Sequence, residues 1–127
     1  MFQESRRIYG KVKNLSFKSL QAAFNQLLDV KVALLFGSRA TPHHSAGKSD
    51  YDFAVLMDKS EPCDWGHLAK LRTDLGSLLS LPDEDFDIID LEIAQPPLLD
   101  SIYTQYKIIK GDFNEIRHLF GKHPKNG

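Results

Sequence analysis

Two short apolar runs separated by a polar segment constrain the fold of this 127-residue chain more than any other feature. Val30–Phe36 is a short apolar run that ends at Gly37, which predicts a buried strand. Residues 52–57 predict a second buried strand. The segment at 37–49 is rich in Gly, Ser, Thr, Pro and His, which is typical of a loop. The chain is therefore expected to contain a β-sheet with a long polar loop between two of its strands.

Helical periodicity and shorter apolar runs account for most of the remaining sequence. Helices are predicted at 17–28, 65–79, 98–106 and 113–120, and further strands at 86–91 and 107–110. Ser16 and Asp64 are suitable N-caps for the first two helices, and a proline such as Pro97 is tolerated in the first turn of the third. This order predicts an α/β fold, an α+β sandwich with a small mixed sheet and helices packed on one face.

The composition indicates one soluble globular domain. Hydrophobic residues make up 42% of the chain and charged residues 26%, which are ordinary values for such domains. A formal net charge of -1 gives no strong field for duplex nucleic acid or a membrane surface. Because no run approaches a membrane span and no secretory signal is visible, we expect a cytoplasmic protein. We predict a loosely ordered arm at 1–14, one domain at 15–121 and a frayed tail at 122–127.

An acidic pair, Asp50 and Asp52, leads directly into the second predicted strand. Alternate residues of a strand lie on the same face, so these two side chains should point together, with Tyr51 on the opposite face. Neighbouring carboxylates repel each other unless a cation lies between them. Mg²⁺ suits such a pair, because it binds oxygen ligands and shares its coordination shell with water and substrate phosphates.

Gly37 and Ser38, at the end of the first strand, are candidates for binding phosphate. Glycine lets backbone N–H groups approach an anion closely, and the serine hydroxyl adds a donor. Arg39 and Lys48 flank this turn and the acidic pair, so both are candidate ligands of a triphosphate. The alternative for each cation is an ordinary exposed side chain. His43, in the same loop and followed by a second histidine, is assigned to solvated surface rather than to a metal site.

Asp87 is the candidate for a third carboxylate, because it interrupts the apolar strand at 86–91. Three acids could hold two metal ions that flank the attacking and leaving oxygens of a phosphoryl transfer. The alternative is a partly exposed aspartate on an edge strand. Asp90 has the opposite parity along the strand, so we assign it to a cap or to the surface. The lone cysteine excludes an internal disulfide or a cysteine zinc site.

The order of these motifs resembles a known family. The Gly-Ser turn at 37–38, the pair Asp50 and Asp52, and Asp87 in a later strand are similar to the nucleotidyltransferase fold of the DNA polymerase β superfamily. Over 17–110 the chain resembles the minimal nucleotidyltransferases, the antitoxins of the MntA–HepT type. The loop before the acidic pair is one residue longer than is usual in that family, which bears on the substrate loop and not on the carboxylates.

The resemblance implies transfer of a nucleoside monophosphate, AMP from ATP, to a hydroxyl group. Gly37 and Ser38 would hold the triphosphate, and Asp50 and Asp52 would bind two Mg²⁺ ions. Asp87 would complete the site of the catalytic metal and accept the proton of the acceptor hydroxyl. By the same resemblance, the acceptor is a tyrosine of a HEPN-type toxin, and the chain is its antitoxin.

Two rival functions remain open at this stage. One is an antitoxin that neutralises its partner by binding alone, although three clustered acids without a metal would be destabilising. The other is nucleotidyl transfer to a small molecule such as an aminoglycoside. Enzymes of that kind carry a further helical domain for the acceptor, and little sequence follows 110 here. An enzyme of nucleic acid is disfavoured because there is no basic stripe.

Overall fold

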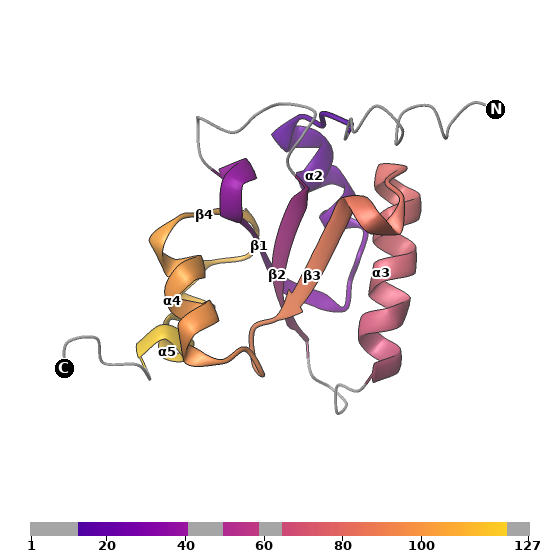
Figure 1. The fold of residues 1–127 in the computed structure, drawn as a ribbon. Coiled ribbons are helices and arrows are strands. Elements are labelled where there is room, and N and C mark those ends of the chain that lie inside the picture. The colour runs from indigo at the N-terminus through magenta and orange to yellow at the C-terminus, as the bar shows by residue number, and fades with distance from the viewer. Residues whose placement is uncertain (1–12, 41–49, 59–64, 122–127) are drawn as a thin grey trace.

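A computed structural model describes residues 13–40, 50–58 and 65–121. Its centre is a four-stranded sheet with the strand order β3-β2-β1-β4 (Figure 1). The strands are β1 (Val30–Phe36), β2 (Tyr51–Met57), β3 (Phe86–Asp90) and β4 (Tyr106–Lys110). β1 pairs antiparallel with β2 and with β4, whereas β2 and β3 are parallel. The sheet is therefore mixed, and the predicted α/β class is confirmed.

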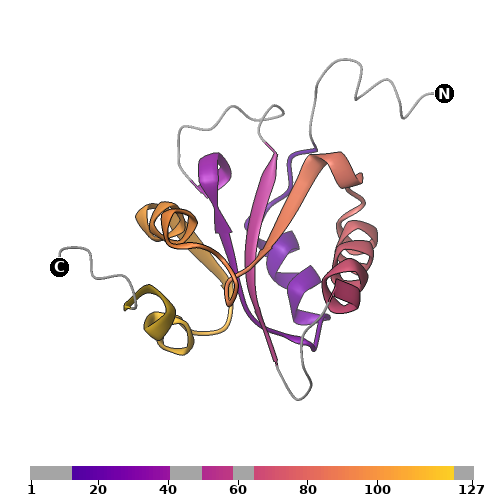
Figure 2. The same ribbon diagram turned by 60° about the horizontal axis from the view of Figure 1, so that its bottom comes forward.

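Helices cover both faces of this sheet, so the prediction that they pack on one face is wrong (Figure 2). The helices are α2 (Phe17–Asn25), α3 (Trp65–Leu79), α4 (Pro96–Thr104) and α5 (Arg117–Gly121). One core cluster joins α2 and α3 to the sheet around Phe24, Phe53 and Leu75. A second joins α4 and α5 to the other face around Leu34 and Ile102. The physical reason is that β1 and β2 are apolar at consecutive positions, so both faces of each strand must be covered.

The first helix is shorter than its apolar pattern predicts. Ser16 caps its N-terminus with a side-chain oxygen that accepts a backbone N–H of the first turn, as expected. The helix ends at Asn25, and Lys110 from β4 donates a hydrogen bond of 2.9 Å to the carbonyl oxygen of Leu27 just beyond it. Leu28, assigned to the apolar face from sequence, consequently lies in the turn before β1 and is 82% exposed.

Short 3₁₀ turns connect several of these elements. They are η1 (Gly37–Ala40), η2 (Asp83–Asp85) and η3 (Phe113–Glu115). The predicted helix at 113–120 is divided into η3 and α5, and the Asp112 side chain caps η3 by accepting the backbone N–H of Asn114. Across the described ranges, no helix has both the length and the apolar character needed to cross a membrane.

Candidate functional site

Three aspartates lie on or beside neighbouring strands of the sheet. Asp52 is paired in register with Phe36 of β1 on one side and with Asp87 of β3 on the other. Asp50 immediately precedes β2. Tyr51 packs in the cluster beneath α2 and α3, so Asp52 projects from the opposite face, the one covered further along by α4 and α5. The alternation predicted from the sequence is therefore present in the structure.

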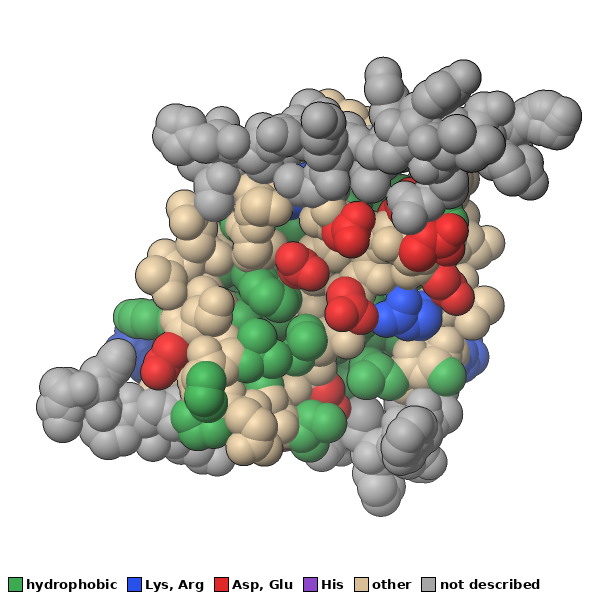
Figure 3. Space-filling model, viewed as in Figure 1, with side chains coloured by type: hydrophobic (Ala, Val, Ile, Leu, Met, Phe, Trp, Pro, Cys, Tyr) green, Lys and Arg blue, Asp and Glu red, His purple; other side chains and the backbone are tan. Residues whose placement is uncertain are grey.

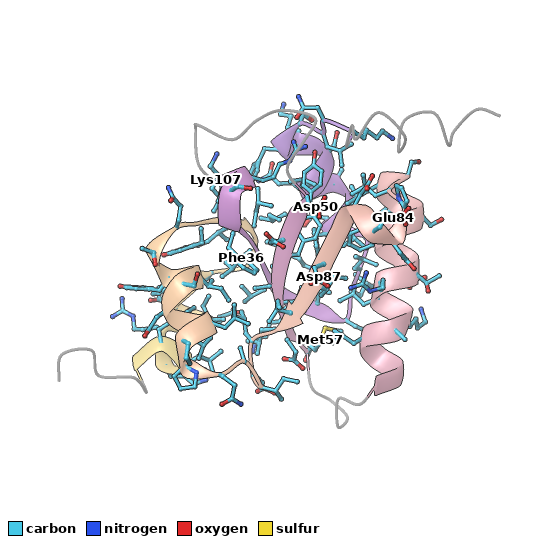
Figure 4. All side chains as sticks on the ribbon, viewed as in Figure 1. Phe36, Asp50, Met57, Glu84, Asp87 and Lys107 are labelled. Atoms are coloured by element: carbon cyan, nitrogen blue, oxygen red, sulfur yellow. The ribbon has the colours of Figure 1, made fainter. Side chains whose placement is uncertain are left out.

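The surface around these residues is acidic. Figure 3 shows Asp and Glu side chains gathered over the middle of the face in view, next to an apolar area. In Figure 4, Asp87 of β3 lies below Asp50 and roughly level with Phe36 of β1, between Asp50 and Met57 along the sheet. The sheet thus brings together three carboxylates that come from two separate parts of the sequence.

The electrostatic environment of Asp52 suits a bound cation. Its carboxylate is half-buried, and burial is the main cause that raises its pKa above the ordinary value of 3.8. The negative charges of Asp87 and Asp50 raise the pKa further. Each of these effects disfavours the ionised form, and a divalent cation placed between the carboxylates would oppose all of them. Hard oxygen ligands of this kind fit Mg²⁺.

Asp87 has a second partner in this structure. Its side chain is 64% exposed on the edge strand β3, and its Oδ1 accepts a 2.8 Å hydrogen bond from Arg72 Nη2 of α3. Within the described ranges, no three His, Cys, Asp or Glu side chains are grouped closely enough to hold a metal by themselves. Asp87 is therefore both an exposed edge-strand residue, the alternative considered from sequence, and the register neighbour of Asp52.

Gly37 lies directly against the carboxylate of Asp52. Its φ is +78°, in the region that favours glycine, and a Cβ built on it would lie 2.5 Å from Asp52 Oδ2. Glycine is thus favoured at this position for two reasons, the backbone conformation and the close approach of the acid. Ser38, in the same η1 turn, is exposed. The turn is therefore positioned to bring backbone groups close to any ligand bound at Asp52.

Arg39 does not join the carboxylates. It is 5% exposed, and its guanidinium lies 4.2 Å from the ring centroid of Tyr51, on the opposite face of the sheet from Asp52. Its Nη1 donates a 2.8 Å hydrogen bond to Asn14 Oδ1. In this conformation Arg39 anchors η1 to the strand behind it, so its position does not support the predicted contact with a triphosphate. Lys48, predicted for the same role, and the histidines at 43–44 lie outside the described residues.

Asp90 has one of the two roles expected from the sequence. It lies on the opposite face from Asp87, as its parity predicts, but it is only 8% exposed, so a surface role is wrong. Its Oδ1 accepts a 2.9 Å hydrogen bond from the backbone N–H of Glu92, which is a cap at the end of β3. The capping interpretation is therefore the one that the structure supports.

Two contributors to the site carried no signal that the sequence analysis recognised. Tyr51 separates the two aspartates, and its hydroxyl donates to Lys13 O and accepts from Leu15 N, both at 2.8 Å. These bonds tie the segment before α2 to the back of β2. Arg72 belongs to an amphipathic helix, where a basic residue is ordinarily a solvated side chain. Neither role could be inferred without knowing which elements pack together.

The comparison with protein families identifies the fold. The family described as "Polymerase beta, Nucleotidyltransferase" matches residues 18–113, which is most of the chain. The chain belongs to the polymerase beta nucleotidyltransferase family. The matched range includes all three aspartates and the η1 turn. No curated protein sequence matches this nucleotidyltransferase chain.

Solved structures with the same fold come from toxin–antitoxin complexes. One is a toxin–antitoxin complex with AMP-PNP, at 25% identity and a TM-score of 0.65, covering 85% of this chain and 83% of that chain. A second is a tri-AMPylated Shewanella oneidensis HEPN toxin in complex with an MNT antitoxin, at 24% identity and a TM-score of 0.61, covering 84% and 82%. A third is the toxin–antitoxin MntA–HepT, at 24% identity and a TM-score of 0.58, covering 83% and 81%. The resemblance to MntA-type nucleotidyltransferases stated from sequence is confirmed.

Proposed function

We propose that this nucleotidyltransferase transfers AMP from ATP to a tyrosine hydroxyl of a HEPN-type toxin and thereby acts as its antitoxin. The observation that carries the proposal is the alignment of Asp52 with Asp87 across parallel strands, with Asp50 beside them and Gly37 against the Asp52 carboxylate. Structures of similar fold that contain AMP-PNP or an AMPylated HEPN toxin support this choice of nucleotide and partner. A nucleotide substrate and a toxin partner also fit a cytoplasmic location.

Different residues of the site would bind the triphosphate and the metal ions. Gly37 and Ser38 would hold the triphosphate through backbone N–H groups and a hydroxyl. Asp50 and Asp52 would hold two Mg²⁺ ions, and Asp87 would complete the shell of one of them. When bound, magnesium neutralises the triphosphate and favours ionisation of the acceptor hydroxyl. The aspartates would also fix the position of the α-phosphate, because their own strands are rigidly paired.

In the proposed reaction, the acceptor oxygen attacks the α-phosphorus of ATP. A new bond forms between that oxygen and phosphorus, while the bond to the β-phosphate breaks and pyrophosphate leaves. The proton of the acceptor hydroxyl passes to Asp87, whose side chain is 64% exposed and therefore accessible to a large acceptor. Such exposure is consistent with an acceptor presented by another protein chain.

The proposal is tested by coexpressing the chain with a HEPN-type partner and measuring the intact mass of the partner. We expect a mass increase of one or more AMP groups in Mg²⁺, and none when purified components are mixed with ATP in EDTA. Transfer that continues undiminished in EDTA would contradict the metal assignment. An unmodified partner that is still neutralised would instead favour the binding-only antitoxin. An aminoglycoside that gains AMP while the partner does not would favour the small-molecule enzyme.

Variants of the acids sharpen this test. Asp50→Asn and Asp52→Asn each remove a charged metal ligand while keeping side-chain shape, so transfer should fall by at least ~100-fold with the fold retained. Asp87→Asn should abolish most transfer but leave much of the ATP·Mg²⁺ binding intact. Asp58→Asn is a matched control, because Asp58 is exposed and follows the other end of β2. The acids would be structural if the three site variants gave less folded protein but each folded molecule transferred AMP at the parent's rate.

A further inference from the structure

Arg72 of α3 makes an unusually complete set of contacts around Asp87. Its Nη2 donates to Asp87 Oδ1 at 2.8 Å, and its Nη1 lies 3.3 Å from the carbonyl oxygen of Phe86 and 3.4 Å from that of Asp83. The guanidinium carbon lies 5.2 Å from the ring centroid of Phe86. The side chain is 32% exposed, so the guanidinium is held from several sides. The planar group therefore has a defined orientation against the start of β3.

Asp87 needs such a support more than Asp52 does. β3 is an edge strand, and the Asp87 side chain is 64% exposed, so packing alone leaves its rotamer free. Asp52, in contrast, is half-buried between β1 and β3 and lies against Gly37. The hydrogen bond from Arg72 holds one oxygen of the Asp87 carboxylate. Because the carboxylate is rigid and planar, the direction of the other oxygen is then restricted as well.

We propose that Arg72 is a positioning residue for transfer: it holds Oδ1 of Asp87 so that Oδ2 faces the catalytic metal and the acceptor hydroxyl. This inference rests on the proposed function, because it assigns Asp87 to that metal and that acceptor. In this role Arg72 would act through its hydrogen bond to Asp87 and not by direct contact with substrate or metal. Partners that orient a metal ligand from outside the coordination shell typically contribute ~10–100-fold to metal affinity or activity.

A positioning role and a simple charge effect predict opposite changes in metal affinity when the guanidinium of Arg72 is removed. If the guanidinium acted only as a competing positive charge, its removal would strengthen metal binding at Asp87. If it orients the carboxylate, its removal leaves Asp87 free to rotate and weakens that binding. Arg72→Lys keeps the charge but loses the planar fork, so it separates the two effects further.

The first measurement is the kinetics of AMP transfer by Arg72→Gln and Arg72→Lys. We expect Arg72→Gln to lower kcat by about 10-fold or more, with the KM for ATP nearly unchanged, and Arg72→Lys to recover part of the loss. Lys70→Gln is the matched control: Lys70 lies on the same helix and pairs with Asp74 at 2.8 Å on the exposed surface. Its kcat should equal that of the parent. An unchanged kcat in Arg72→Gln, or a loss that follows only the folded fraction, would overturn the inference.

The second measurement does not depend on an acceptor. Mn²⁺ binding to the protein with AMP-PNP, followed by electron paramagnetic resonance, should show two ions in the parent. Arg72→Gln should weaken the second ion by about 10-fold and leave the first unchanged. A second ion that binds equally or more tightly in Arg72→Gln would refute the positioning role. If the parent bound both ions in this pattern but transferred no AMP to the partner, the proposed function would fail, while the role of Arg72 in orienting Asp87 toward the metal would stand.

Discussion

Replacing Gly37 with alanine is the most specific perturbation of this site that the structure offers. The glycine adopts a φ of +78°, and an added Cβ would lie 2.5 Å from Asp52 Oδ2, whereas ordinary contact begins at 3.4 Å. The carboxylate must therefore move by roughly 1 Å, and it can move because it is the end of a side chain. We expect Gly37→Ala to fold and to have a displaced Asp52.

The two consequences of this change differ greatly in size. A left-handed conformation costs a residue with a Cβ roughly 1–2 kcal/mol, which lowers the unfolding midpoint of a domain this size by about 4–8 °C. A displacement of about 1 Å in a catalytic group can reduce the reaction rate by ~100-fold. Gly37→Ala should therefore lose far more transfer activity than stability. A thermal unfolding scan that starts at about 25 °C measures the loss of stability. The rate of AMP transfer to the partner at about 25 °C measures the loss of activity.

Gly111→Ala is the control for backbone strain. Gly111 has a similar φ of +88°, and its added Cβ would lie 2.6 Å from the carbonyl oxygen of Lys31, which is backbone and cannot turn aside. This variant should be destabilised at least as much as Gly37→Ala, yet keep normal transfer per folded molecule, because it lies in the turn after β4. Equal losses of transfer in the two variants would refute the link between Gly37 and Asp52.

Two further predictions concern the residues on either face of β2. Asp52→Asn should raise the unfolding midpoint of the metal-free protein at pH 7, because burial and the neighbouring acids raise the pKa of Asp52 when folded. Because the pKa of Asp52 is raised in the folded protein, its contribution to stability is fully present below the ordinary value of 3.8 and is lost as the pH rises through the pKa of the folded state. The unfolding midpoints of the parent and of Asp52→Asn should therefore converge in acid. Adding Mg²⁺ should stabilise the parent and not this variant; a lower midpoint for Asp52→Asn without metal contradicts the reasoning. Tyr51→Phe removes the hydroxyl that hydrogen-bonds Leu15 N and Lys13 O, so the unfolding free energy measured in urea should fall by about 1–3 kcal/mol. An unchanged unfolding free energy would show that water replaces the hydroxyl.

Much of the site could be predicted because its defining features are local. Alternation along an extended strand places Asp50 and Asp52 on one face and Tyr51 on the other, whatever the strand pairs with. A glycine after an apolar strand indicates a turn for the same local reason, and Gly37 has the positive φ that makes glycine necessary. The bounds of β1 agree with those predicted because its apolar run ends sharply in polar sequence.

Features that depend on packing were not accessible in the same way. The apolar runs of β1 and β2 required cover on both faces, but no pattern in the helices stated which face each would occupy. Leu28 has helical spacing and yet is exposed, because α2 ends at Asn25 and Leu28 lies in the turn before β1. Arg39 follows the turn immediately and could have pointed either way, and the ring of Tyr51 holds it on the face away from Asp52.

Consecutive residues alone are enough to predict a glycine turn, an acidic pair on one face of a strand, and an acid in a later strand. Long-range packing places β3 parallel to β2 in the register that sets Asp87 beside Asp52, and it brings Arg72 of α3 to Asp87. The physical reason is that strand periodicity is a property of consecutive residues. Register and helix packing instead depend on how distant apolar surfaces fit together.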